Sequence, residues 1–194
     1  MNEKLYKLMN WPEIEELVYS ECDNPHKLLG AQKVGRNLLI QGFFPGADGV
    51  SVISENKTYV CEKEDEAGYF AVLLPVHKVP KYKFSIKTGE IETESYDPYA
   101  FPCQITEEEE KQFCAGVYYH AYEKRGAHPV TIDGVEGTLF AVWAPNAMRV
   151  SVVGDFNNWD GRCHMMHRMP MSGIFELFIP GVKAGNAYKY EIKI

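Results

Sequence analysis

The feature that most constrains the fold of this chain is an internal repeat. Three blocks of the first half recur roughly 100 residues later: 44–52 as 144–152, 68–75 as 173–180, and 82–86 as 188–192. The spacing between the copies grows where the second one inserts the sequence GDFNNWDGR. The repeat predicts two tandem domains of one topology, which differ chiefly in that inserted loop.

Each copy is a series of short segments rich in strand-forming residues. In the first copy these segments are 38–44, 50–53, 58–61, 69–74, 82–86 and 91–96, and Gly, Pro or charged residues separate them. Many short strands at this spacing are typical of a β-sandwich. We therefore predict an all-β fold of two tandem sandwiches.

The second copy carries the stretch around which the rest is organised. Residues 139–143 and 149–153 flank a Pro145-Asn146 turn, which predicts a β-hairpin. The polar loop 154–159 follows and holds one large aromatic residue, Trp159. A loop that carries an indole among amides, on a scaffold of strands, is a candidate for ligand contact.

Two short helices are expected outside the strands. Residues 10–20 place apolar side chains on one face and glutamates in the first turn, as in a short amphipathic helix. Thr106 and Glu109 satisfy the capping-box pattern, so a second helix should run to about Cys114. The glutamates at 107–110 are explained by that cap and the helix dipole better than by a metal or acidic-substrate site.

The second copy ends earlier than the first. In the first copy, residues 87–101 add a further strand and the segment DPYAF, whereas the second copy stops at Ile194. We expect the second sandwich to lack its last strand, and the polypeptide to be a piece of a longer one. Full pairing of residues 183–194 within their own sandwich would count against this. The predicted division is an N-terminal helix (1–21), a first sandwich (22–104), a helical linker (105–121) and a second, truncated sandwich (122–194).

Composition and charge exclude several classes of function. With 45% hydrophobic residues the chain has enough apolar side chains for a core. A net charge of −7 argues against nucleic acid and against an anionic membrane surface as partners. The start of the chain has no apolar core of a signal peptide, and no apolar run is long enough to span a membrane. Five widely spaced cysteines, an odd number, favour reduced thiols and a cytoplasmic location.

No pattern in the sequence predicts catalysis or a cofactor. The acidic residues lie in expected caps, turns and strand edges, without a defensible pair of carboxylates. His164 and His167 form an HxxH sequence, but no further ligand follows at a convincing spacing. We expect no catalytic residue, no metal site and no cofactor in this chain.

Six segments together carry a family resemblance: 24–32, 97–101, 122–129, 133–166, 172–182 and 188–192. They resemble the amino-terminal part of bacterial 1,4-α-glucan (glycogen) branching enzymes. The resemblance implies two immunoglobulin-like sandwiches, the second a carbohydrate-binding module of family 48. In the family these precede a (β/α)₈ barrel of glycoside hydrolase family 13, which has no counterpart here. The sequence departs from the family at Asn24 and Gln32 (usually Asp and His), at Met165 (commonly Pro) and at Phe175 (usually Trp).

The resemblance also implies the chemistry of the parent enzyme, a transferase of glycogen biosynthesis. Retaining transglycosylation uses an aspartate nucleophile and a glutamate acid and base, and a glucan 6-hydroxyl replaces water as acceptor. In the family those residues lie on the barrel, beyond position 194, so this chain alone should be inactive. The implied partners are an α-glucan, such as glycogen or a maltooligosaccharide, and the enzyme's own catalytic barrel.

The carbohydrate-binding residues that we expect are Trp159, Lys189, Asn157 and Asn158. An indole offers a flat apolar platform to the C–H face of a sugar, and amides or an ammonium group offer hydrogen bonds to its hydroxyls. In glucan-binding relatives, the positions that match Trp159 and Lys189 contact sugar. The alternatives are packing for Trp159, plain solvation for Lys189, and local turn formation for the two asparagines. For Trp143, within a strand, packing is the favoured role.

Three functions remain open on the sequence alone. The leading one is an amino-terminal, non-catalytic piece of a branching enzyme that positions glucan and braces the barrel. The second is an autonomous glycogen-binding regulatory module, similar to the glycogen-binding domain of a kinase regulatory subunit. The third is a structural spacer without affinity for sugar.

Overall fold

The computed structural model describes residues 2–118 and 120–194, and the chain divides into two compact units. The first comprises Met1–Val18 and His26–Ala100, and the second comprises Tyr19–Pro25 and Phe101–Ile194. The N-terminal helices thus belong to the first unit, and the linker helix belongs to the second. The exact boundaries expected from the sequence stay a prediction.

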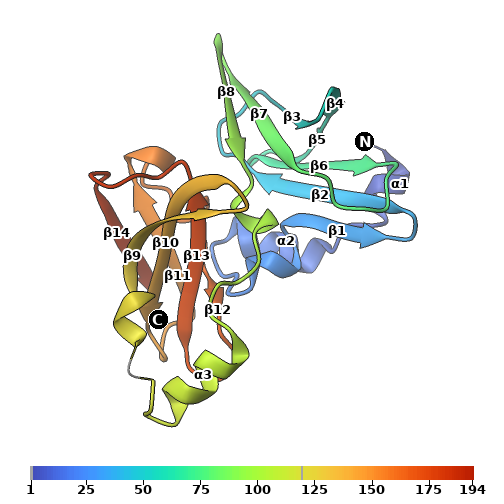
Figure 1. Cartoon of the computed structure of the whole chain (residues 1–194). Helices are drawn as coiled ribbons and strands as arrows, with labels where there is room; N and C mark the ends of the chain where they lie inside the picture. The colour runs from blue at the N-terminus through green and yellow to red at the C-terminus, as the bar shows by residue number, and fades with distance from the viewer. Residues whose placement is uncertain (1, 119) are drawn as a thin grey trace. The chain divides into compact units, whose positions relative to one another are not determined.

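The first unit is a sandwich of two four-stranded antiparallel sheets (Figure 1). One sheet has the order β1-β2-β6-β5 and the other the order β4-β3-β7-β8. The strands are β1 (Gly30–Val34), β2 (Asn37–Phe43), β3 (Gly49–Ser54), β4 (Lys57–Val60), β5 (Glu62–Asp65), β6 (Tyr69–Leu74), β7 (Tyr82–Thr88) and β8 (Ile91–Tyr96). The 3₁₀ turn η2 (Pro98–Ala100) follows β8.

Apolar side chains from both sheets meet between the layers of the first unit. β3 alternates buried and half-buried residues along its length, as expected of a strand with one face toward a core. Val50 and Val52 of β3 pack with Leu38 and Ile40 of β2 and with Phe70 of β6. The strand segments predicted for this unit at β2, β3, β4, β6, β7 and β8 are confirmed within a residue or two.

The second unit repeats this arrangement with fewer strands (Figure 1). One sheet has the order β12-β13-β10-β9, and the other contains β11 and β14 alone. The strands are β9 (Gly126–Ile132), β10 (Val135–Trp143), β11 (Arg149–Gly154), β12 (His167–Arg168), β13 (Ile174–Pro180) and β14 (Tyr188–Lys193). The predicted all-β class, two tandem sandwiches, is confirmed.

Strand register confirms the internal repeat residue by residue. Val50 lies opposite Ile86 in the first unit, and Val150 lies opposite Ile192 in the second. The backbone N–H of Cys61 donates to the Val50 carbonyl, and that of Met166 donates to the Val150 carbonyl, both at 2.9 Å. The two copies therefore share hydrogen-bond topology as well as sequence pattern.

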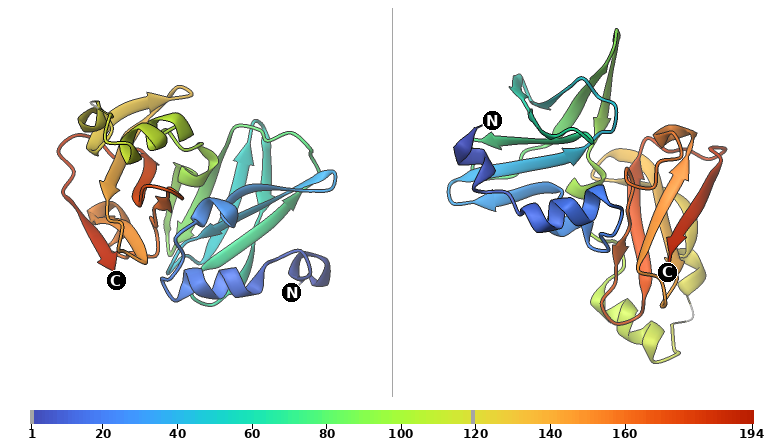
Figure 2. Two further views of the ribbon diagram at one scale, coloured as in Figure 1. Left: turned by 90° about the horizontal axis from the view of Figure 1, so that it is seen from below. Right: turned by 180° about the vertical axis from the view of Figure 1, so that it is seen from behind.

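In the described part of the chain, three α-helices lie outside the strands (Figure 2). α1 (Glu3–Tyr6) was not predicted, whereas α2 (Trp11–Val18) confirms the predicted amphipathic helix and buries Ile14 and Leu17. α3 (Glu107–Cys114) begins at the predicted capping box. The Thr106 hydroxyl accepts from the Glu109 N–H, and the Glu109 carboxylate accepts from the Thr106 N–H at 2.8 Å.

The predicted β-hairpin around Pro145-Asn146 is wrong. β10 pairs with β9 and β13, whereas β11 pairs with β14, so the two strands belong to different sheets. The connecting segment hydrogen-bonds to both layers: the Ala144 N–H donates to the Gly173 carbonyl at 3.1 Å, and the Met148 N–H donates to the Lys193 carbonyl at 2.8 Å. The chain thus crosses from one sheet to the other at the turn, as its first copy does between β2 and β3.

β14 forms an edge of its sheet within the described residues. It pairs with β11 over six residues, from Tyr188 opposite Gly154 to Lys193 opposite Arg149. In the first unit the equivalent strand, β7, lies between β3 and β8. The strand expected to be lacking from the second sandwich is thus absent from residues 120–194, and residues 188–193 are paired on one side only. Within the described parts of the chain, no helix has the length and apolar character needed to cross a membrane.

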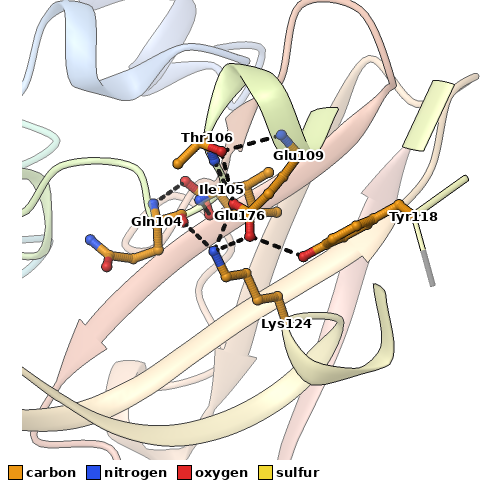
Figure 3. Close-up of polar contacts among 7 residues, drawn as sticks. All are labelled: Gln104, Ile105, Thr106, Glu109, Tyr118, Lys124 and Glu176. Carbon is orange, nitrogen blue, oxygen red and sulfur yellow. Dashed lines mark hydrogen bonds and ion pairs between the residues drawn. The ribbon is translucent and has the colours of Figure 1, made fainter. Parts of the chain in front are cut away.

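A buried carboxylate ties the linker to the second sandwich (Figure 3). Glu176 of β13 accepts from the backbone N–H groups of Gln104 and Ile105 at 2.8 and 3.0 Å. Lys124 donates to the Gln104 carbonyl at 2.8 Å and to Glu109 at 2.7 Å. Burial raises the pKa of the Glu176 carboxyl above its ordinary value, against hydrogen bonds that lower it. These partners give Glu176 a structural role.

Candidate carbohydrate-binding site

The loop after β11 carries the indole of Trp159 on a backbone with two residues of positive φ. A single 3₁₀ turn, η4 (Asp155–Asn157), leads into Asn158 and Trp159, whose φ angles of 54° and 59° lie in the left-handed region. Asparagine tolerates this region, but tryptophan adopts it at a steric cost. Strained backbone of this kind persists only where surrounding contacts hold it, and it gathers at functional sites.

Hydrogen bonds from the Asn157 side chain stabilise this loop conformation. This side chain is 7% exposed, its Oδ1 accepts from the Gly154 N–H at 3.0 Å, and its Nδ2 donates to the Val152 carbonyl at 2.8 Å. The same amide lies 2.8 Å from Nδ1 of His164. Burial lowers the pKa of His164 to about 4, so near pH 7 the ring is neutral and its Nδ1 can accept.

The indole itself remains open to solvent. Trp159 is 43% exposed, and its Nε1 donates to Oδ1 of Asp155 at 2.8 Å. Its backbone N–H donates to the Gly154 carbonyl at 3.0 Å. Both ends of the residue are therefore fixed while the ring stays accessible, which is the geometry of a platform and not of a core side chain.

A cation from the neighbouring strand covers part of this platform. Lys189 of β14 lies opposite Val153 of β11, and its Nζ is 6.0 Å from the centroid of the Trp159 ring. This is within the range of a cation–π contact. Asn158 and Lys189 are both exposed beside the indole. The structure thus brings Trp159 and Lys189 together, with Asn158 next to them, and turns Asn157 inward.

Two supports of the loop were missed by reasoning from sequence. One is Asp155, which orients the indole, and the other is the ion pair of Asp160 and Arg162, with nitrogen–oxygen distances of 3.0 and 2.8 Å. The Arg162 side chain lowers the pKa of Asp160 below its ordinary value. The only signal for either was the position of acidic residues within the loop, four residues before the indole and directly after it.

Trp143 lies elsewhere in the second unit, at the end of β10. Its ring meets Phe113 of α3 edge-on with centroids 5.9 Å apart, and its Nε1 donates to the Ser172 carbonyl at 2.9 Å. The side chain is nevertheless 53% exposed. Trp143 therefore contacts the linker helix and still leaves much of its surface open to solvent.

Each of the two units matches a known protein family. Residues 10–99 match the family described as "alpha-1,4-glucan branching enzyme GlgB, N-terminal domain", and residues 124–194 match "Carbohydrate-binding module 48 (Isoamylase N-terminal domain)". A 1,4-alpha-glucan branching enzyme of Thermosynechococcus vestitus is 40% identical over 188 residues, which cover 93% of this chain and 24% of that enzyme. The chain belongs to the amino-terminal region of the branching-enzyme family. A branching enzyme of Rhizobium meliloti gives a similar match, 39% identical over 93% of this chain and 25% of its own length.

This amino-terminal region spans about a quarter of the length of the relatives it matches. Among solved structures, a type I pullulanase of Bacillus subtilis complexed with maltose is 17% identical, over 84% of this chain and 24% of that one. The TM-score of this match is 0.30.

Proposed function

We propose that this chain is the non-catalytic, α-glucan-binding region of a glycogen branching enzyme. The longer protein would cleave an α-1,4-glucan and transfer the segment to a 6-hydroxyl, and this region would position the glucan and brace the catalytic barrel. The family matches support the parent activity, because both amino-terminal families cover their expected residues. A cytoplasmic location is part of the same proposal, on the ground of five widely spaced cysteines.

One observation carries the sugar-binding part: an exposed indole held rigidly beside an exposed ammonium group. A glucose ring has an apolar C–H face that can stack on Trp159, and Lys189 can donate to its hydroxyls. Asn158 is placed to add a polar contact. Asn157 belongs to the site as the residue that shapes the loop, because its amide is engaged with Gly154, Val152 and His164.

The test is a titration of the 194-residue chain with maltoheptaose and with β-cyclodextrin, followed by calorimetry. Trp159→Ala should weaken binding at least about tenfold, which corresponds to about 1.4 kcal/mol. Trp143→Ala is the matched control, because it removes another exposed indole from the same unit. It should leave the affinity for both sugars unchanged.

The same experiment separates the alternatives. A chain that binds neither sugar would be a structural spacer, and the proposal would fail. Equal losses of binding and of thermal stability in Trp159→Ala would mean that the indole packs the loop and does not form a platform. An autonomous regulatory module is distinguished by the full-length protein: branching activity on a long glucan should fall with Trp159→Ala if this region serves an enzyme.

A further inference from the structure

Arg149 of β11 is a buried arginine whose guanidinium group has three partners. It is 5% exposed, and its Nε donates to the Ser20 carbonyl at 3.1 Å. Its Nη1 donates to the Ser151 hydroxyl oxygen at 2.8 Å, and its Nη2 lies 2.8 Å from the Glu191 carboxylate. A planar guanidinium presents its donors in a rigid fork, so it fixes the relative positions of the segments that supply the acceptors. We refer to these four residues as the arginine cluster.

Two members of the arginine cluster lie close in sequence to the two halves of the candidate sugar site. The Ser151 hydroxyl donates to the Gly161 carbonyl at 2.5 Å, and Gly161 follows Trp159 by two residues. Glu191 lies on β14 two residues after Lys189, so both side chains leave the same face of the strand. The arginine cluster therefore holds the end of the indole's loop against the strand that carries the ammonium group.

Gly161 lets the loop close tightly over the arginine cluster. A Cβ at this position would lie 2.8 Å from the carboxyl carbon of Glu191 and 3.0 Å from Nη1 of Arg149. Because contacts this short force a group to move, any larger residue would displace the Glu191 carboxylate or the loop. The loop, the arginine and β14 are thus in direct contact at one point.

The third partner of the guanidinium comes from a distant part of the chain. Tyr19–Pro25, which we call the strap, belongs to the second unit although the sequence places it between two parts of the first. Glu21 of the strap pairs with Lys193 of β14 at 2.9 Å. The Asp23 carbonyl accepts from the Arg168 N–H of β12, also at 2.9 Å. The strap is therefore bound to the second unit at its surface as well as at the buried arginine.

Comparison of the two units shows that the scaffold does not need the arginine cluster. In the first sandwich, Gly49 takes the place of Arg149, and Ser85 takes the place of Glu191. β3 and β7 keep the equivalent register without this ion pair. The arginine and its carboxylate partner thus occur in the unit that has the inserted loop, which points to a role for them in that loop.

We propose that Arg149 is a positioning residue of the sugar platform, and that the strap sets the affinity for α-glucan through it. The docked strap completes the set of acceptors around the guanidinium, which then keeps Trp159 and Lys189 at the separation seen in the structure. Release of the strap leaves the guanidinium with one acceptor fewer and loosens the loop relative to β14. This inference rests on the proposed sugar binding at Trp159 and Lys189.

The coupling between strap and sugar must act in both directions. If the docked strap raises the affinity for glucan, bound glucan stabilises the docked strap by the same factor. The Arg168 N–H reports the docked state, because it donates to the Asp23 carbonyl and exchanges with solvent when that hydrogen bond opens. Hydrogen exchange at this amide therefore measures strap docking independently of the sugar titration.

The first measurement is a calorimetric titration of the 194-residue chain and two variants with maltoheptaose. Arg149→Lys keeps the charge, but one ammonium group does not reproduce the fork, so the affinity should fall at least about fivefold. Glu21→Lys combined with Asp23→Lys places like charges opposite two cations of the second unit. This strap variant should lose at least about threefold in affinity. The side chains of Glu21 and Asp23 are 50% and 48% exposed, so the strap variant alters no buried group.

Each variant has a matched control, and hydrogen exchange supplies the second measurement. Arg125→Lys changes another arginine of the second unit, whose guanidinium lies 5.0 Å from the centroid of Phe113, and should leave the affinity unchanged. Glu66→Lys combined with Glu90→Lys makes the same change of net charge at exposed positions of the first unit, again without effect. Exchange of the Arg168 N–H should accelerate in the strap variant. In the original chain, saturating maltoheptaose should slow it at least about threefold.

The contrary outcomes separate this inference from the proposed function. A purely structural role would lower the unfolding temperature of Arg149→Lys and leave its affinity, measured well below that temperature, unchanged, which would overturn the inference. Full affinity in the strap variant would overturn it as well, and this variant decides alone if Arg149→Lys does not fold. An original chain that binds no maltoheptaose would overturn the proposed function and this inference together. Binding that is lost in Trp159→Ala but retained in Arg149→Lys and in the strap variant would overturn this inference alone.

Discussion

The two units differ most in the connection that leaves an otherwise equivalent strand. After β3 the first unit makes a tight turn at Glu55 and enters β4 directly. After β11 the second unit inserts a longer loop, and its chain rejoins the sheet near Met165, which bridges to Ser151 as Val60 pairs with Ser51. The strands keep their register on both sides of this difference. A duplicated scaffold can therefore acquire a longer loop with an exposed indole in one connection without a change in strand register.

Equivalent lysines make the same point at closer range. Lys83 of β7 lies 4.8 Å from the centroid of Tyr96, an aromatic ring of its own neighbouring strand β8. Lys189, its counterpart in β14, lies instead over the Trp159 ring of the inserted loop. One cation is used within the sheet, whereas the other is presented together with an exposed platform.

The largest effect should come from the part that the two units share, their cores. Phe70 and Phe175 occupy equivalent positions on β6 and β13 and are 2% and 0% exposed. Truncation of either to alanine should cost about 3–5 kcal/mol, because it removes buried area and leaves a cavity. Chemical denaturation with hydrogen exchange as the readout should show the loss in the unit that carries the substitution.

Val60→Ala provides the control for the core prediction, since this side chain is 75% exposed and should matter by less than about 0.5 kcal/mol. If Phe70→Ala destabilised its unit and Phe175→Ala did not, the two cores would not be equivalent. The comparison would then hold for backbone topology only.

Much of the shared scaffold could be predicted from the sequence, because strand alternation and the repeat are local patterns. The exceptions have physical causes. β1 and β5 were missed because edge strands such as Gln32-Lys33 and Glu62–Asp65 are polar, and β9 was missed because Pro129 interrupts its pattern. The hairpin prediction failed because turn residues do not reveal whether a chain stays in one sheet or crosses to the other.

The residue types of the candidate site could be read from the sequence, but the orientations of their side chains could not. Trp159 and Lys189 come together as expected, because the loop and β14 are neighbours. The inward direction of Asn157 could not be foreseen, since it depends on His164, which the fold brings back beside Val152. Side-chain hydrogen bonds between segments are set by the tertiary structure, and spacing along the chain does not encode them.

The next largest effect should come from the connection that distinguishes the units. Asn157→Ala removes two hydrogen bonds to buried backbone groups and one to His164, and should cost about 1–3 kcal/mol. The matched change is Asn56→Ala in the short turn of the first unit, where the side chain is exposed and the cost should stay below about 0.5 kcal/mol. Thermal unfolding of both variants measures the difference. Similar costs would mean that the inserted loop is no better ordered than the turn it replaces.

Acid should act in opposite directions through two buried groups, His164 of the second unit and Asp97 of the first. Burial lowers the pKa of His164 from 6.5 to about 4, so the unfolded chain binds more protons there, and stability is lost as pH falls from about 6.5 to about 4. Burial raises the pKa of Asp97 from 3.8 to about 6, against hydrogen bonds from Tyr82 and Tyr99. The folded chain then binds more protons at Asp97, and this contribution is largest below pH 3.8 and is lost as pH rises through about 6.

The contribution of each group is obtained by comparing the unfolding free energy of the original chain with that of a variant that lacks the group. The pH dependence of unfolding free energy should flatten in His164→Gln for the second unit and in Asp97→Asn for the first, each by on the order of 1 kcal/mol. Glu109 and Asp160 also have lowered pKa values and destabilise the second unit at still lower pH, so the comparison is made between about pH 4 and 6.5. If the unfolding free energy depended on pH equally in the original chain and in His164→Gln, the pKa of His164 would not change on folding.

The smallest effect on stability, and the sharpest on function, should come from the two lysines. Lys189→Ala removes a cation–π contact at an exposed position, and Lys83→Ala removes one at a half-buried position together with a 3.8 Å ion pair to Glu94. Each change should cost less than about 1 kcal/mol in unfolding free energy. Only Lys189→Ala should weaken maltoheptaose binding, by roughly threefold to tenfold, because only its ammonium group lies beside an accessible indole. Calorimetric titration of both variants measures this. If Lys83→Ala reduced the affinity as much, sugar would be bound at both copies of the scaffold, and the inserted loop could not be the feature that separates them.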